Sequence, residues 1–106
     1  MSWIIVLVAG LFEIVMALSL ESSHGFRRLL PSLGFLVFGA ISFYLLAVAL
    51  RELPVGTAYA VWTGTGAVGT AVLGILLLGE SANFWRLGGI LLIVAGIVAL
   101  RLAPGS

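Results

Sequence analysis

The sequence predicts an all-α integral membrane protein with four transmembrane helices in each protomer. Of its 106 residues, 62% are hydrophobic and 8% are charged, and the mean hydropathy is +1.30. Soluble domains carry charge on about a quarter of their residues, so this composition excludes a water-soluble globule. It also excludes a disordered chain, which requires low hydrophobicity. Since a transmembrane helix needs about 20 apolar residues, the length allows four spans with short loops.

The first apolar run predicts a helix over about residues 3–20, and it ends where the polar segment Glu21-Ser22-Ser23 begins. A cleaved secretory signal would have a basic start and a shorter apolar core. This run has no basic residue before it, and Glu13 lies inside it. We therefore expect the segment to belong to the mature fold.

Three further runs predict helices over about residues 29–50, 55–78 and 84–102. Pro31 falls in the first turn of the second run, where proline is tolerated. The segment Arg51-Glu52-Leu53-Pro54 closes the second run, and Gly79-Glu80-Ser81-Ala82-Asn83 closes the third. Backbone polar groups in hydrocarbon must be satisfied internally, which favours helices. Residues 1–106 are thus predicted to form a single four-helix membrane domain.

The few polar residues exclude several classes of function. All five basic residues are arginines and the formal net charge is +1, so there is no basic patch for nucleic acid. The chain has no cysteine and one histidine, His24. Disulfides and thiolate chemistry are therefore absent. We expect no metal site, no cofactor and no enzymatic activity.

The arginines also bear on orientation in the membrane. With four spans, Arg51 and Arg101 share one side, and Arg27, Arg28 and Arg86 share the other. Two against three is almost no bias under the positive-inside rule. One interpretation is that other signals fix the topology. The alternative is that the chain inserts in both orientations and pairs with an inverted copy of itself, which would provide the symmetry that many transporters obtain from inverted repeats.

Glu13 is the candidate functional residue, because it is the eleventh of 18 residues in the first run and lies near the bilayer midplane. A charge at that depth costs about 2.5–3.5 kcal/mol on insertion scales, and such residues usually serve function. Desolvation favours the protonated carboxyl, so Glu13 is predicted to bind and release a proton. In a dimer, two such carboxyls would titrate together. The alternative is a permanently protonated, structural Glu13.

Residues that share a face with Glu13 are consistent with a cation site. Gly10 and Met16 lie three residues before and after it, and a small residue such as Gly10 leaves room for a ligand or a close helix. Ser42 places a hydroxyl group near the centre of the second run. A serine in a membrane helix often bonds its own backbone, so Ser42 alone is weak evidence.

The third run contains aromatic and glycine residues near its middle. Tyr59 and Trp62 are three residues apart and share a face, which favours aromatic walls for a cation, with the phenol and the indole N–H as donors. Ordinary packing is the alternative. Gly64, Gly66 and Gly69 cluster mid-helix, where each glycine costs about 1 kcal/mol relative to alanine. They are predicted to form a hinge, although close packing would also explain them.

The fourth run predicts a contact surface for another helix. Gly89 and Gly96 are seven residues apart on one face, and Ile93 falls between them. Small residues at that spacing let helices approach closely in a membrane. The run has no central polar group, so we expect Gly89, Ile93 and Gly96 to lie at a dimer interface.

Four motifs, in this order, carry a resemblance to a known family. They are Ala9-Gly10-Leu11-Phe12-Glu13, Ser23-His24-Gly25-Phe26 followed by Pro31-Ser32, Leu53-Pro54-Val55-Gly56-Thr57-Ala58-Tyr59-Ala60-Val61-Trp62-Thr63-Gly64, and Gly79-Glu80-Ser81-Ala82-Asn83. Together they resemble the small multidrug resistance family over essentially the whole chain, and within it the guanidinium-exporting subtype. The third motif is the most specific of the four.

The resemblance implies an antiparallel, dual-topology homodimer in the bacterial inner membrane. It also implies proton-coupled antiport that exports guanidinium or small substituted guanidiniums, such as guanylurea-like cations. Protons and substrate would share Glu13, and Ser42, Tyr59 and Trp62 match the positions that surround this glutamate in the subtype.

One residue departs from the subtype, which usually has tryptophan where this chain has Met16. A thioether cannot donate a hydrogen bond, but it adapts to larger or more apolar groups. A polyspecific exporter of quaternary ammonium and other hydrophobic cations therefore stays open as the alternative transport function. A cation channel and a structural or regulatory membrane subunit are alternatives of other classes.

Overall fold

The computed structural model describes residues 1–104, which form four α-helices. The helices are α1 (Ser2–Ser22), α2 (Leu29–Ala49), α3 (Val55–Leu77) and α4 (Phe84–Leu102). All four are long and apolar enough to cross a membrane. Their ends lie within two residues of the ranges expected from the apolar runs. The prediction of an all-helical protein with four long apolar helices is confirmed.

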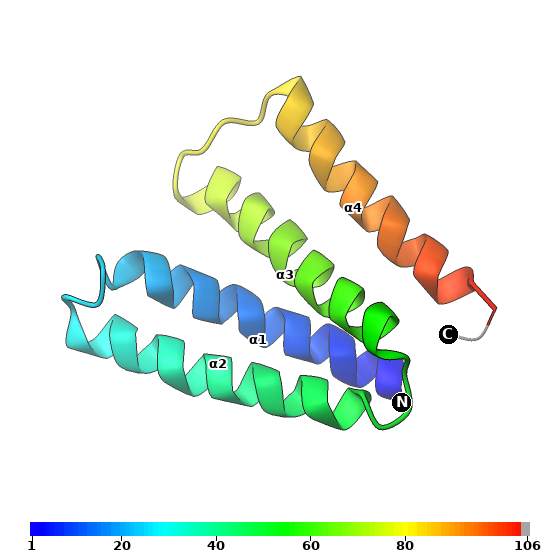
Figure 1. Ribbon diagram of the computed structural model, residues 1–106. Helices are drawn as coiled ribbons and strands as arrows, with labels where there is room; N and C mark the ends of the chain where they lie inside the picture. Colours follow the sequence, from blue (N-terminus) through cyan, green and yellow to red (C-terminus); the bar gives the residue numbers. More distant parts are fainter. Residues whose placement is uncertain (105–106) are drawn as a thin grey trace.

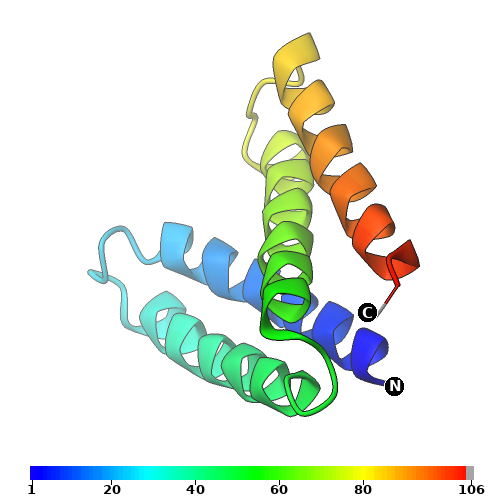
Figure 2. The ribbon, with the colours of Figure 1, turned by 45° about the vertical axis from the view of Figure 1, so that its right-hand side comes forward.

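The helices form a packed group of three and a more separate fourth. α1 lies along α2 and crosses α3, whereas the backbone of α4 lies close to that of α3 alone among the described helices (Figure 1). The turned view shows the α1–α2 pair in one layer and α3 with α4 in another (Figure 2). The start of α1, the α2–α3 loop and the end of α4 lie toward one end of the molecule, as four alternating spans require (Figure 1).

The buried core lies where α1, α2 and α3 meet. Its members are small or medium-sized apolar residues and one tryptophan: Val6, Ala9, Leu46, Ala49, Leu53, Ala58, Val61 and Trp62. Small side chains let helix backbones approach closely, which is how helices associate in lipid. By contrast, α4 contains no buried residue.

Short polar segments end the helices. Ser23 Oγ donates to Leu20 O at 2.7 Å and accepts from Phe26 N at 3.1 Å, so one side chain satisfies backbone groups on both sides of the first turn. Gly25 follows with φ +73°, which glycine adopts without strain. At the other loop, Asn83 Oδ1 accepts from Arg86 N at 2.9 Å and caps α4.

Candidate functional site

Glu13 lies at the crossing of α1 and α3, against the backbone of Gly66. A Cβ atom added to Gly66 would lie 2.5 Å from Glu13 Cδ, so any larger residue would require the carboxyl group to move. The Oε1 atom of Glu13 is buried and has no hydrogen-bond partner within residues 1–104. Glycine at position 66 therefore makes the space that the carboxyl group occupies.

Two further contacts extend this crossing. A Cβ on Gly10 would lie 2.6 Å from Thr65 Cγ2, and a Cβ on Gly69 would lie 2.6 Å from Ile14 Cγ1. Each glycine of one helix thus faces a side chain of the other. We call these contacts and the Glu13–Gly66 contact the glycine crossing. Glycines at such positions allow the backbones of two membrane helices to approach closely.

A buried hydrogen-bond relay joins three helices close to the glycine crossing. Trp62 Nε1 donates to Ser42 Oγ at 2.8 Å, and Ser42 Oγ donates to Ala9 O at 2.7 Å. Ser42 is fully buried and Trp62 is 4% exposed. Ala9 lies about one helical turn before Glu13. Ser42 therefore bonds the backbone of α1 rather than that of its own helix, and the indole N–H is donated to Ser42 rather than to Glu13.

The ring of Trp62 is part of an aromatic cluster that reaches the surface of the protomer. Its centroid lies 5.0 Å from that of Phe43 and 5.5 Å from that of Tyr59, with both pairs tilted. Phe43 is 55% exposed and Tyr59 is 56% exposed. Because the relay holds the indole edge, the remaining ring faces and the Tyr59 side chain form an aromatic wall on α2 and α3.

Met16 lies against α2 rather than in the relay. Its Sδ atom is 3.0 Å from the position that a Cβ on Gly39 would take. The thioether lines an apolar cavity of about 250 Å³ together with Phe35, Leu36, Gly39, Ala40 and Phe43. Phe43 thus belongs both to this cavity and to the aromatic cluster, so the two features adjoin.

The predicted hinge glycines lie within an unbroken helix. α3 runs continuously from Val55 to Leu77 through Gly64 and Gly66. Gly66 faces Glu13, whereas a Cβ on Gly64 would lie 3.1 Å from Ile97 and 3.3 Å from Ile93 of α4. Close helix contact thus accounts for both glycines in this conformation, and the hinge stays a prediction.

The three residues expected at a dimer interface differ in their surroundings. A Cβ on Gly89 or Gly96 would have nothing within 4 Å, and both positions are exposed. Ile93 is 38% exposed and lies near Gly64, so it contacts α3 of its own chain. The two glycines are open to a second helix, and Ile93 borders them.

Thr65 and Phe43 are missing from the sequence-based prediction of the site, and Gly69 is predicted only as a member of the mid-helix glycine cluster. Thr65 and Gly69 belong to a strip of α3 that points inward at helical spacing. The strip contains Ala58, Trp62, Thr65, Gly66 and Gly69. That periodicity was available in the sequence as a signal. Phe43 follows Ser42 directly, but nothing in the sequence indicates its contact with Trp62.

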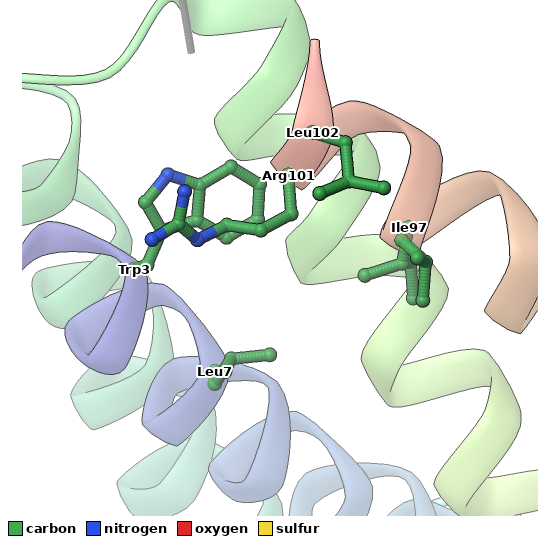
Figure 3. Close-up of a pocket in the computed structure, with 6 residues that line it drawn as sticks. Trp3, Leu7, Ile97, Arg101 and Leu102 are labelled. Atoms are coloured by element: carbon green, nitrogen blue, oxygen red, sulfur yellow. The ribbon is translucent and has the colours of Figure 1, made fainter.

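A second cavity lies far from Glu13, between the ends of α1 and α4. It has a volume of about 260 Å³ and is lined by Trp3, Leu7, Ile97, Val98, Arg101 and Leu102 (Figure 3). The guanidinium carbon of Arg101 lies 5.3 Å from the centroid of the Trp3 ring, a cation–π contact. Because a cation already lies there and no acid lines the cavity, it does not suit a positively charged ligand.

Glu13 is the only acid within the middle of the three packed helices. α2 and α3 contain no Asp, Glu, His, Lys or Arg between Leu29 and Ala49 or between Val55 and Leu77. The other acids, Glu21, Glu52 and Glu80, lie at helix ends or in loops. Glu80 pairs with Arg86 at 2.8 Å. An unpaired carboxyl group in apolar surroundings can hold either a proton or a cation, and the site offers no other counter-charge.

Comparison with known proteins identifies the relatives of the chain. The sequence profile of the family described as Small Multidrug Resistance protein matches residues 1–93. A guanidinium exporter of Yersinia pseudotuberculosis is 59% identical over 103 residues, which are 97% of this chain and 99% of the relative. The guanidinium exporter of Escherichia coli K12 is 57% identical over 97% of this chain and 98% of the relative. The chain belongs to the small multidrug resistance family.

Proposed function

We propose that the protein is a proton-coupled antiporter that exports guanidinium or small substituted guanidinium cations across the bacterial inner membrane. The observation that carries the proposal is the carboxyl of Glu13 at the glycine crossing, whose Oε1 atom is buried and unpaired. The relatives named guanidinium exporters, which match nearly the full chain, support it. No cofactor takes part in this proposal.

The chemistry follows from competition for one carboxyl group. Guanidinium is planar and rich in N–H donors, so a carboxylate can bind it through two parallel hydrogen bonds. A proton on the same carboxyl removes the negative charge and with it the attraction. Coupling then requires that the empty, deprotonated form does not switch access, so that inward movement of protons is exchanged for outward movement of the cation.

The relay and the aromatic cluster would complete the binding site. Ser42 holds Trp62 by its N–H and bonds Ala9 O, which lies about one helical turn before Glu13 on α1. The Trp62 and Tyr59 rings provide faces that attract a cation. Gly10 keeps the two helices close, one turn from the carboxyl. In this arrangement Glu13 binds the substrate, and Ser42, Tyr59, Trp62 and Gly10 shape its surroundings.

We further propose that the working unit is an antiparallel, dual-topology homodimer. Tyr59 and Phe43 present their exposed sides outward from the protomer, so a second copy would enclose the substrate.

The open glycines Gly89 and Gly96 would form the contact between α4 helices, with Ile93 beside them. The near balance of arginines across the membrane is compatible with insertion in both orientations. Bending at Gly64 and Gly66 would then exchange the two access states.

The cavity beside Met16 bears on substrate range. Its volume of about 250 Å³ and its apolar lining suit a substituent on the guanidinium nitrogen rather than a second charge. The volume of the cavity therefore favours transport of substituted guanidiniums along with guanidinium itself.

The test is solid-supported membrane electrophysiology on the reconstituted full chain. We expect guanidinium and guanylurea to evoke transient currents that respond to an imposed pH gradient, with much smaller currents from tetra-alkylammonium ions. Larger tetra-alkylammonium currents would favour the quaternary ammonium exporter. Cation flux that ignores the pH gradient would instead indicate a channel.

Replacing the carboxyl provides the matched pair of variants. Glu13→Gln, and also Glu13→Asp, should abolish coupled exchange while the dimer still assembles, as measured by cross-linking. Glu21→Gln removes an exposed acid from the end of the same helix and should transport like the original chain. Loss of assembly in Glu13→Gln would make Glu13 a structural residue and contradict the proposal.

A further inference from the structure

Two threonines on α3 lie two residues apart, but their hydroxyl groups differ in hydrogen bonding. Thr63 Oγ1 donates to Tyr59 O at 2.8 Å, which is the usual bond of a threonine within a helix. Thr65 Oγ1 is buried and has no partner in the part of the chain that the structure describes. A buried polar atom without a partner is uncommon and requires a physical reason.

The unpaired hydroxyl lies at the same helix crossing as the unpaired carboxyl. Thr65 contacts α1 at Gly10, and the next residue, Gly66, contacts α1 at Glu13. Gly10 and Glu13 are three residues apart and so lie one above the other on the same face. Glu13 Oε1 and Thr65 Oγ1 are thus two unpartnered polar atoms on neighbouring levels of the glycine crossing.

Rotation of one side-chain bond would change the direction in which the Thr65 hydroxyl points. In this conformation the Thr65 methyl carbon faces Gly10 at 2.6 Å from the Cβ position, and Oγ1 is farther from it at 3.6 Å. Threonine in a helix populates two χ1 rotamers, and the change between them moves the hydroxyl relative to the methyl group. A hydroxyl can donate to a carboxylate or accept from a protonated carboxyl.

Two other candidate donors near the glycine crossing are engaged, one neighbour of Glu13 has no proton to give, and Tyr59 lies in the exposed aromatic cluster. Ser42 donates to Ala9 O, and Trp62 donates to Ser42. Met16, three residues after Glu13, is a thioether and has no donor. Thr65 is therefore the unengaged hydroxyl at the glycine crossing.

We propose that Thr65 is a positioning residue for the exchange, whose hydroxyl donates a hydrogen bond to the deprotonated Glu13 carboxylate and holds it in the orientation that binds the cation. This role rests on the proposed function of Glu13 as the shared proton and cation site. Because Thr65 acts on the charged form, it sets the pH at which protons displace the substrate. It also favours ligands that approach the carboxylate from the side opposite the hydroxyl.

The groups around Glu13 leave few other sources for such a pH effect. On α2 and α3, which pack against α1, the titratable side chains are Tyr44 and Tyr59, and both are exposed. On α1 itself the other acid is Glu21, about two turns away at the exposed helix end. α4 carries Arg86 and Arg101 near its two ends and does not contact α1 closely.

The experiment compares Thr65→Val with the matched control Thr63→Val in the full-length, purified protein. Valine keeps the shape of threonine and removes only the hydroxyl. We expect Thr65→Val to weaken guanidinium binding about tenfold and to raise the pH of half-maximal displacement by about one unit. Thr63→Val should leave both quantities unchanged, and Thr65→Ser should retain them because it keeps the hydroxyl. Thr65→Val with unaltered affinity and pH profile would overturn the inference.

A second readout needs no substrate. The infrared C=O stretch of protonated Glu13, identified by its loss in Glu13→Gln, can be titrated in each variant. We expect the band to persist to higher pH in Thr65→Val than in the original chain, and an identical titration would overturn the inference even if the protein transports nothing. Absence of guanidinium-driven proton exchange in the original chain would instead count against the proposed function. If Thr65→Val assembles poorly, Thr65→Ala gives the same comparison.

Discussion

The glycines of this small protein fall into two groups with opposite surroundings. At the glycine crossing, Gly10, Gly66 and Gly69 each face a side chain that occupies the space where a Cβ would be. On α4, a Cβ added to Gly88, Gly89 or Gly96 would meet nothing within 4 Å. The same residue type thus makes room for a partner helix in one region and faces open space in the other.

This difference shows which glycines have a packing partner within the single chain and which do not. A glycine inside a helix costs about 1 kcal/mol relative to alanine, whatever its surroundings. At the glycine crossing, close packing of α1 on α3 offsets that cost. On α4 no contact within the described chain offsets it, and α4 contains no buried residue. A second copy packed closely against Gly89 and Gly96 would offset the cost of these two glycines in the same way.

The largest effect is expected for Gly66→Ala. The added methyl group would overlap the end of the Glu13 side chain, which is flexible and can move aside. The fold should therefore survive, with the free energy of unfolding lowered by about 1–3 kcal/mol. The rate of proton–guanidinium exchange should fall by about two orders of magnitude or more, because the carboxyl is displaced. Transport in proteoliposomes and thermal stability in detergent, measured on the same preparation, test both expectations.

Gly69→Ala is the matched control, because its methyl group would meet Ile14 rather than Glu13. A branched side chain close to the backbone cannot move away as freely, so stability should fall by a similar or larger amount. The pH dependence of exchange should stay unchanged in the folded fraction. Equal loss of transport in the two variants, in proportion to stability, would mean that Gly66 serves packing alone.

The contrast between the two regions also shows what the sequence could predict. The helices follow from apolar runs long enough to span a membrane, and Glu13 stands out because it is an acid in the middle of one. The relay through Ser42 was not predictable, since a serine in a helix most often bonds its own backbone. Its bond to Ala9 O depends on how closely α2 approaches α1. Likewise, Thr65 looks like Thr63 in the sequence, and only packing against Gly10 distinguishes them.

A smaller effect is expected for Gly89→Leu combined with Gly96→Leu. Both positions are exposed in the protomer, so the monomer should fold normally. If they lie at the proposed dimer contact, two bulky side chains would separate the α4 helices and weaken dimerisation by about 1–3 kcal/mol, which is about 5- to 150-fold. Cross-linking or single-molecule photobleaching in liposomes measures the dimer fraction.

Val98→Leu adds bulk on the opposite side of α4 and serves as the control, since Val98 is also exposed. It should leave the dimer fraction unchanged. Dimerisation that withstands both leucines would place the contact on another helix and remove the explanation for the open glycines.

The smallest effect is expected for Gly88→Ala. This substitution measures the helix-propensity cost of a glycine that takes no part in the proposed helix contact. Gly88 adjoins Gly89 but lies outside the predicted contact pair, and a methyl group there has open space. Alanine should therefore stabilise α4 by up to about 1 kcal/mol through helix propensity alone, with the dimer fraction unchanged. Thermal unfolding in detergent measures the first quantity and cross-linking the second. A gain in stability would show that glycine at this position carries its helix-propensity cost without a packing contact that offsets it. A loss of dimer would instead extend the proposed contact to Gly88, because a single methyl group matters only where another helix already lies against it.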